Sequence, residues 1–79
     1  MPYIMSNIKE ALKTRSPVTP GELNYKLTLL CKEYWENHSN YLGINDIIGA
    51  LEGCKLEFYR RVAAPYENQK IHDNGDVYN

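Results

Sequence analysis

The residues that could carry chemistry are concentrated in one basic, tyrosine-containing stretch in the second half of the chain. Residues three or four apart on a helix are neighbours, so this spacing places aromatic rings beside cationic groups. Arginine and lysine suit phosphate oxygens, and tyrosine rings stack on bases. We therefore predict that six side chains, called the basic–tyrosine cluster, bind an anionic ligand. They are Lys55, Tyr59, Arg60, Arg61, Tyr66 and Lys70.

Acidic residues in the same stretch leave a structural interpretation open. Glu57 lies one helical turn before Arg61, and Glu67 is close in sequence to Arg60 and Lys70. The cations could therefore form solvated or interfacial ion pairs instead of contacting a ligand.

Other kinds of site lack the residues that they need. His38 and His72 are isolated, and neither Cys31 nor Cys54 has a partner at metal-ligand spacing. The sequence contains no glycine-rich phosphate loop and no nucleophile elbow. We therefore expect no metal, no cofactor and no enzymatic activity.

Length and composition predict a small protein that associates with itself. The 79 residues suffice for a single domain, 1–79, and a chain so short buries only about 60% of its unfolded surface. The formal charge of -1 argues against a generic duplex-binding protein. No apolar run approaches the roughly 18 residues of a membrane span, and no signal peptide is evident. We expect a cytoplasmic homo-oligomer with buried free thiols, placed in the host cytoplasm if a phage encodes it.

The clearest predicted element is a helix from about residue 20 to 37. Thr19 is placed to be its N-cap, Pro20 occupies the first helical position, and Glu22 can return the capping bond. The apolar residues that follow recur at spacings of three and four and define one buried face. They are Leu23, Leu27, Leu30, Cys31, Tyr34 and Trp35.

A second long helix is predicted from near Asn45 to Ala63 or Ala64. Because the loop before it is short, we expect the two helices to pack antiparallel, with Leu27 and Leu51 in the core. Its apolar stripe consists of Ile44, Ile47, Ile48, Leu51, Cys54, Phe58 and Val62. Gly49 and Gly53 each cost up to about 1 kcal/mol against alanine in a helix. They predict close approach of another helix, within the chain or between subunits.

The two ends of the chain are predicted to be less regular. Residues 1–5 should be extended, and a short helix capped by Ser6 or Asn7 should follow to about residue 14. Pro65 should end or kink the long helix, and Asn74-Gly75 is typical of a type I′ hairpin turn. The predicted fold is all-α: an antiparallel helical hairpin with a short N-terminal helix and an extended or hairpin C-terminal tail.

Three segments resemble a family of uncharacterised small proteins of phages, prophages and bacteria. They are MPYI at the start, GELNY at 21–25, and ALEGCKLEFYRRVAAPYENQKIHDNGDVY at 50–78. Within the last, the pattern EFYRRV-PYE-K-NGDVY is the specific mark of the family. The resemblance implies a viral or mobile-element setting and brings no activity with it. Small helical phage proteins often oppose host defence, in some cases as oligomers that sequester a nucleotide immune signal.

Two functions are consistent with these features. The first is a phage-type, homo-oligomeric binding protein that sequesters a cyclic oligonucleotide or related nucleotide through the basic–tyrosine cluster. The second is a protein-interaction module that inhibits or adapts a host enzyme. Its apolar, tyrosine-rich surface would make the contact, since the chain has seven tyrosines.

Overall fold

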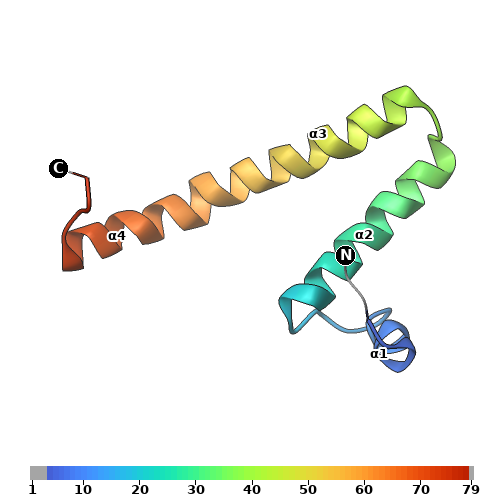
Figure 1. The fold of residues 1–79 in the computed structure, drawn as a ribbon, viewed down its shortest axis with the longest axis horizontal. Helices are drawn as coiled ribbons and strands as arrows, with labels where there is room; N and C mark the ends of the chain where they lie inside the picture. The colour runs from blue at the N-terminus through green and yellow to red at the C-terminus, as the bar shows by residue number, and fades with distance from the viewer. Residues whose placement is uncertain (1–3, 79) are drawn as a thin grey trace. The chain divides into compact units, whose positions relative to one another are not determined.

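The computed structural model describes residues 4–78, and every regular element in it is helical (Figure 1). In chain order the elements are α1 (Ser6–Ala11), α2 (Pro20–Asn37), α3 (Tyr41–Phe58), the π-helix η1 (Tyr59–Ala63) and α4 (Ala64–Asn74). No strand occurs between residues 4 and 78, so the predicted all-α class is confirmed. The chain divides into two compact units, Met1–Ile47 and Ile48–Asn79. Of the extended start predicted for residues 1–5, residues 1–3 lie outside the described range.

Helix α1 begins after Met5 without a side-chain cap. The backbone of Met5 is extended, and its carbonyl accepts hydrogen bonds from the Ile8 and Lys9 amides, each at 3.0 Å. The predicted capping by Ser6 or Asn7 is therefore wrong, because Ser6 is already the first helical residue. Leu12 follows the helix directly and is 1% exposed. Among the described hydrophobic residues it is the one that is fully buried.

Helix α2 begins and ends where its sequence predicts. The Thr19 hydroxyl accepts a hydrogen bond from the Glu22 amide at 3.1 Å, and Pro20 is the first helical residue. The proline ring fixes φ near the helical value, and its missing N–H would have had no partner there. The Glu22 carboxylate returns a bond one residue earlier than expected, because it accepts from the Val18 amide at 2.9 Å.

A three-residue turn separates α2 from α3 within the first unit. The Asn40 side-chain oxygen accepts from the Gly43 amide at 2.7 Å, and this cap starts α3 at Tyr41, earlier than the predicted Asn45. The Tyr34 hydroxyl donates to Asp46 at 2.8 Å and joins the end of α2 to the start of α3. The antiparallel packing of the two helices along their lengths stays a prediction.

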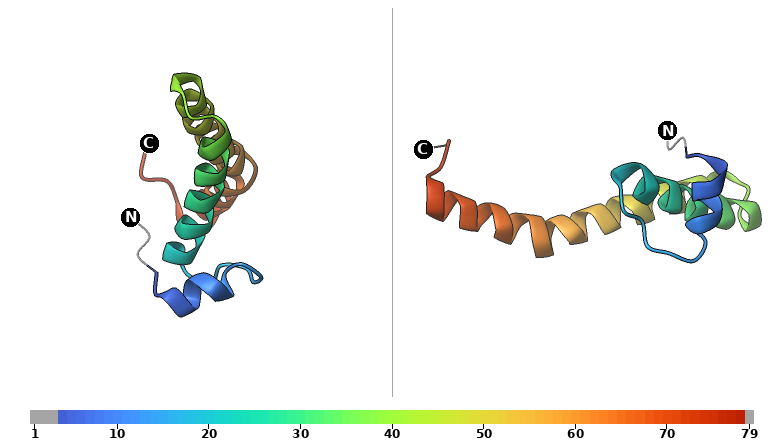
Figure 2. Two further views of the ribbon diagram at one scale, coloured as in Figure 1. Left: turned by 90° about the vertical axis from the view of Figure 1, so that its right-hand side faces the viewer. Right: turned by 90° about the horizontal axis from the view of Figure 1, so that it is seen from below.

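In the second unit the chain is helical without interruption from Ile48 to Asn74 (Figure 2). Pro65 does not end the helix as predicted. A proline ring clashes with the carbonyl four residues earlier, here that of Arg61, and η1 widens the backbone at that place. The Ala64 amide accordingly bonds to the Tyr59 carbonyl, five residues back.

The tail differs from the predicted hairpin. Residues 71–74 belong to the last turn of α4, and the helix ends at Gly75, whose φ is 90°. The Gly75 amide donates to the Ile71 carbonyl at 2.8 Å. A left-handed glycine directly after a helix is a common C-terminal cap. The Asn74-Gly75 pair therefore ends a helix here and does not form a β-turn.

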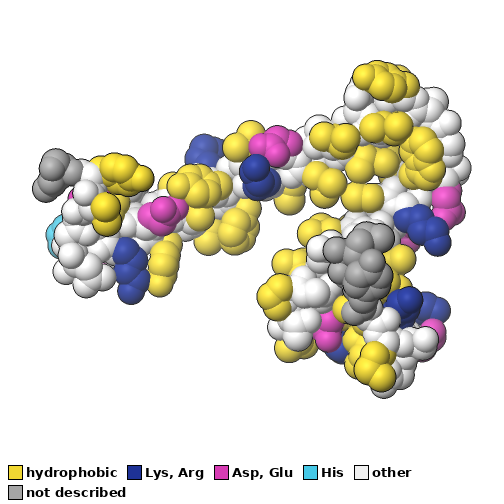
Figure 3. All heavy atoms as spheres, in the orientation of Figure 1, with side chains coloured by type: hydrophobic (Ala, Val, Ile, Leu, Met, Phe, Trp, Pro, Cys, Tyr) yellow, Lys and Arg dark blue, Asp and Glu magenta, His cyan; other side chains and the backbone are white. Residues whose placement is uncertain are grey.

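Most large hydrophobic side chains of the described residues are exposed (Figure 3). Leu27 and Leu51, predicted to be core residues, are 39% and 42% exposed. The predicted buried thiols differ as well, since Cys31 is half-buried and Cys54 is exposed. The periodicity correctly groups residues that share a helix face, but the chain by itself leaves those faces uncovered.

Candidate functional site

The basic–tyrosine cluster lies entirely on the helical run of the second unit. Lys55 is in α3, residues 59–61 are in η1, and Tyr66 and Lys70 are in α4. All six side chains belong to exposed residues. The predicted placement of these residues on one helical segment is therefore correct, and the π-helix at its centre is a feature that the sequence analysis missed.

Two arginines of the cluster converge on one carboxylate. Arg60 Nη2 lies 3.2 Å from Glu57 Oε1, and Arg61 Nε donates to the same oxygen. Both arginine side chains are 67% exposed. The Glu57–Arg61 pair is thus formed as the structural interpretation predicts. Because exposed ion pairs are worth only about 0–1 kcal/mol, both guanidinium groups can exchange Glu57 for another anion at little cost.

The remaining members of the cluster also have neighbours on their own helix. Lys55 Nζ lies 3.2 Å from Glu52 Oε1, and Lys70 Nζ lies 5.5 Å from the centre of the Tyr66 ring. The second contact is a cation–π interaction. It keeps an aromatic face and a cation together, as stacking on a base beside a phosphate would require.

Glu67 is directed to a tyrosine and not to the cations proposed for it. A hydrogen bond to the Glu67 carboxylate raises the pKa of the Tyr59 hydroxyl above its ordinary value. The two residues are eight apart, and the extra residue in η1 helps to bring them onto one face. The sequence spacing alone does not predict this contact, because it follows from the π-helix.

The cluster can bind an anion but offers no groups arranged for catalysis. Its contacts all come from one helical run, so a single chain reaches a phosphate from one side only. Enclosing a whole nucleotide would require a second chain. Within residues 4–78, no group of three or more histidine, cysteine or acidic side chains is placed to hold a metal ion.

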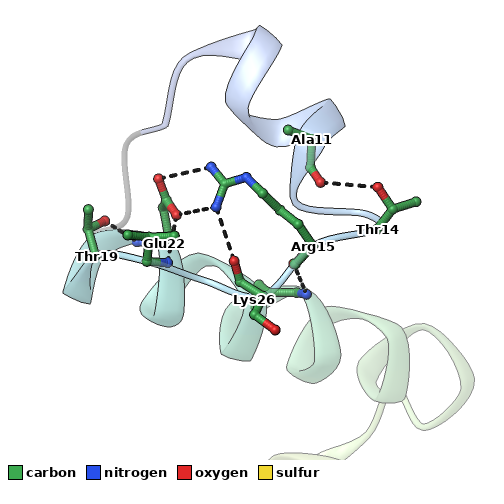
Figure 4. A network of polar contacts seen from close by, with 8 residues as sticks. Ala11, Thr14, Arg15, Thr19, Glu22 and Lys26 are labelled. Carbon is green, nitrogen blue, oxygen red and sulfur yellow. Dashed lines mark hydrogen bonds and ion pairs between the residues drawn. The ribbon is translucent and has the colours of Figure 1, made fainter.

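A second polar network, in the first unit, was not recognised from the sequence (Figure 4). The Arg15 guanidinium forms two bonds to the Glu22 carboxylate, Nη1 to Oε1 at 2.8 Å and Nη2 to Oε2 at 3.3 Å. Lys26 Nζ donates to the Arg15 carbonyl at 2.8 Å. These bonds fix the connector between α1 and α2 against α2. An arginine a few residues before a capped, acidic helix start is the pattern that would have indicated the network.

The Arg15–Glu22 pair should make stability depend on pH. The bond from Arg15, followed by that from the Val18 amide, lowers the pKa of Glu22 from 4.5 to about 2. A carboxylate with a lowered pKa stabilises the fold above its unfolded pKa and loses that contribution as the pH falls toward the folded one. Glu22→Gln should therefore unfold at lower denaturant concentration than the unmodified protein at pH 7, and the gap should narrow between pH 4.5 and 2.

Circular dichroism during urea titration at several pH values measures this effect. Glu36→Gln, on an exposed position of α2, is the matched control and should follow the unmodified protein. A gap for Glu22→Gln that stays constant down to pH 2 would contradict the assigned ion pair.

The comparisons with known proteins place the chain in a family without adding an activity. A family model described as Domain of unknown function (DUF6899) matches residues 1–77. No curated protein and no solved structure matches the chain. Among the described helices, none combines the length and the apolar character that crossing a membrane requires.

Proposed function

We propose that this chain, which belongs to the DUF6899 family, acts by binding a protein partner through the helical run of residues 48–74 and catalyses no reaction. One observation carries the proposal. Residues 48–62 and 65–78 are all exposed, and many of them are large and apolar. Water-exposed apolar surface that continues along an element is typical of a protein-binding site.

The physical argument rests on the stability of helices. A single helix gains most of its stability from packing an apolar face and little from helix propensity. The helical run carries such side chains, among them Leu51, Phe58 and Ile71, yet none of its residues is buried. A binding partner would supply the missing packing, and helix-in-groove or helix-on-helix contact is the corresponding mode of recognition.

An anionic ligand is the second candidate, and the position of Arg60 and Arg61 favours it. Both guanidinium groups surround one exposed carboxylate oxygen of Glu57, an arrangement that also suits a phosphate group. In a phage or prophage setting, the ligand would be a cyclic oligonucleotide or a related nucleotide that an oligomer holds without turnover. Tyr59 and Tyr66 would then stack on its bases.

Native mass spectrometry of the protein purified from its own cells distinguishes the two candidates. We expect a complex with protein, either another copy or a different chain. Single chains without any bound protein would contradict the proposal. A retained nucleotide would favour the second candidate, and Arg60→Ala or Arg61→Ala should then weaken its binding about ten- to hundredfold. Lys32→Ala, which changes an exposed cation of α2, is the control for the loss of one charge.

A further inference from the structure

Five apolar side chains of the second unit form one continuous seam along its helical run. The seam consists of Ile48, Leu51, Phe58, Val62 and Tyr66. Leu51 and Phe58 are seven residues apart, and seven residues fall only about 20° short of two helical turns. Ile48 lies three residues before Leu51, and Val62 lies four after Phe58, so both adjoin the same line.

The π-helix returns Tyr66 to this seam. Tyr66 follows Phe58 by eight residues, which in a regular α-helix would turn it about 80° away from Phe58. Between them, η1 accommodates one extra residue, shown by the bond from the Ala64 amide to the Tyr59 carbonyl. The eight residues therefore turn like seven, and the Phe58-to-Tyr66 step repeats the Leu51-to-Phe58 step. The distortion at Pro65 thus has a consequence for packing, because it keeps the seam straight.

The seam is exposed throughout. Ile48, Phe58 and Tyr66 are 62%, 63% and 63% exposed, and Leu51 and Val62 are 42% and 51% exposed. A seven-residue apolar repeat of this kind is the pattern by which one helix packs along another. The seam therefore fits another helix better than it fits a flat surface or a small ligand.

The exposed area is of the size that an intimate dimer buries. The chain exposes 6822 Å², whereas a folded monomer of 9.2 kDa exposes about 4,900 Å². The excess is thus about 1,900 Å² per chain, and obligate dimers bury about 1,000–2,500 Å² on each partner. A standard transient interface, at about 800 Å² per partner, would cover less than half of it.

We propose that the partner on this seam is a second copy of the chain, so that two seams pack against each other around a two-fold axis. This inference rests on the proposed function, since it names the protein partner. A helical unit without buried residues needs its partner in order to stay folded, and another copy is present whenever the chain is made. Two-fold homodimers are also the most common soluble assemblies. The basic–tyrosine cluster flanks the seam, so pairing brings two clusters near one another.

Sedimentation equilibrium of the purified protein tests the inference. The unmodified chain should have the mass of a dimer at micromolar concentration, and its thermal midpoint should rise with protein concentration. Phe58→Glu should raise the dissociation constant about thirtyfold or more, as loss of a central interface residue does. Phe58→Ala should act in the same direction, and because alanine favours helix, lost helix propensity cannot explain its effect.

Leu56→Glu is the matched control. Leu56 is 57% exposed on the same helix, but it points about 140° away from Leu51. Its substitution should leave the dimer intact, within about threefold in affinity. If Leu56→Glu dissociates the dimer as far as Phe58→Glu does, the seam is not the interface. If the unmodified chain is monomeric at every concentration, self-pairing is wrong. A complex with a different protein in native mass spectrometry would then still support the proposed function.

Discussion

Gly43→Ala should disrupt the turn between α2 and α3 and destabilise the first unit by about 3 kcal/mol or more, at or beyond the upper end of the usual cost of overpacking. Gly43 is buried, and a Cβ at this position would lie 1.8 Å from the backbone oxygen of His38. A backbone carbonyl cannot move aside by changing rotamer, so the turn itself would have to open. The loss is large for a domain whose total stability is only about 5–15 kcal/mol.

Urea unfolding followed by Trp35 fluorescence measures this loss, since the single tryptophan lies at the end of α2. Gly49→Ala is the matched control, because a Cβ there meets nothing within 4 Å. That variant should be more stable by up to about 1 kcal/mol, the propensity difference between glycine and alanine in a helix. A Gly43→Ala protein that is as stable as the unmodified one would show that the turn has a different conformation.

Leu12→Ala should cost about 2–5 kcal/mol, the range for removing a buried leucine side chain. Leu12 is 1% exposed, and it is the one fully buried hydrophobic residue in the described part of the chain. Since few other side chains contribute to this core, its loss should separate α1 from α2 before it unfolds α2 itself.

Urea unfolding and limited proteolysis of the connector near residue 15 measure the two consequences. Val18→Ala is the control, because Val18 is 79% exposed and surface substitutions usually stay within about 0.5 kcal/mol. Equal effects of the two substitutions would contradict a core centred on Leu12. An effect of Leu12→Ala on the assembled dimer but not on cleavage near residue 15 would place Leu12 in an interface.

Where local rules determine the structure, the sequence alone was sufficient. The Thr19-Pro20 start of α2 and its end at Asn37 were predicted correctly, because capping and proline geometry act over a few residues. The pairing of Glu57 with Arg61 was predicted for the same reason, since one helical turn separates them. The all-α class followed from the repeated spacing of apolar residues.

Local rules gave the wrong result where two of them competed. Pro65 was expected to end or kink the helix, and Asn74-Gly75 was expected to form a hairpin. In the structure, the π-helix before Pro65 accommodates its ring, so the helix continues and Gly75 becomes a C-terminal cap. Whether a helix absorbs a proline depends on what the neighbouring turns can accommodate, and no single-residue preference contains that information.

The sequence by itself determined which residues form helices and which side chains share a face, because both depend on spacing along the chain. Only the tertiary structure decided that Leu12 is buried while Leu27 and Leu51 are exposed, and that Arg15 reaches Glu22. It also decided that an extra residue in η1 aligns Tyr66 with Phe58. The physical reason is that periodicity defines an apolar face without defining what covers it, since burial depends on contacts between segments distant in sequence.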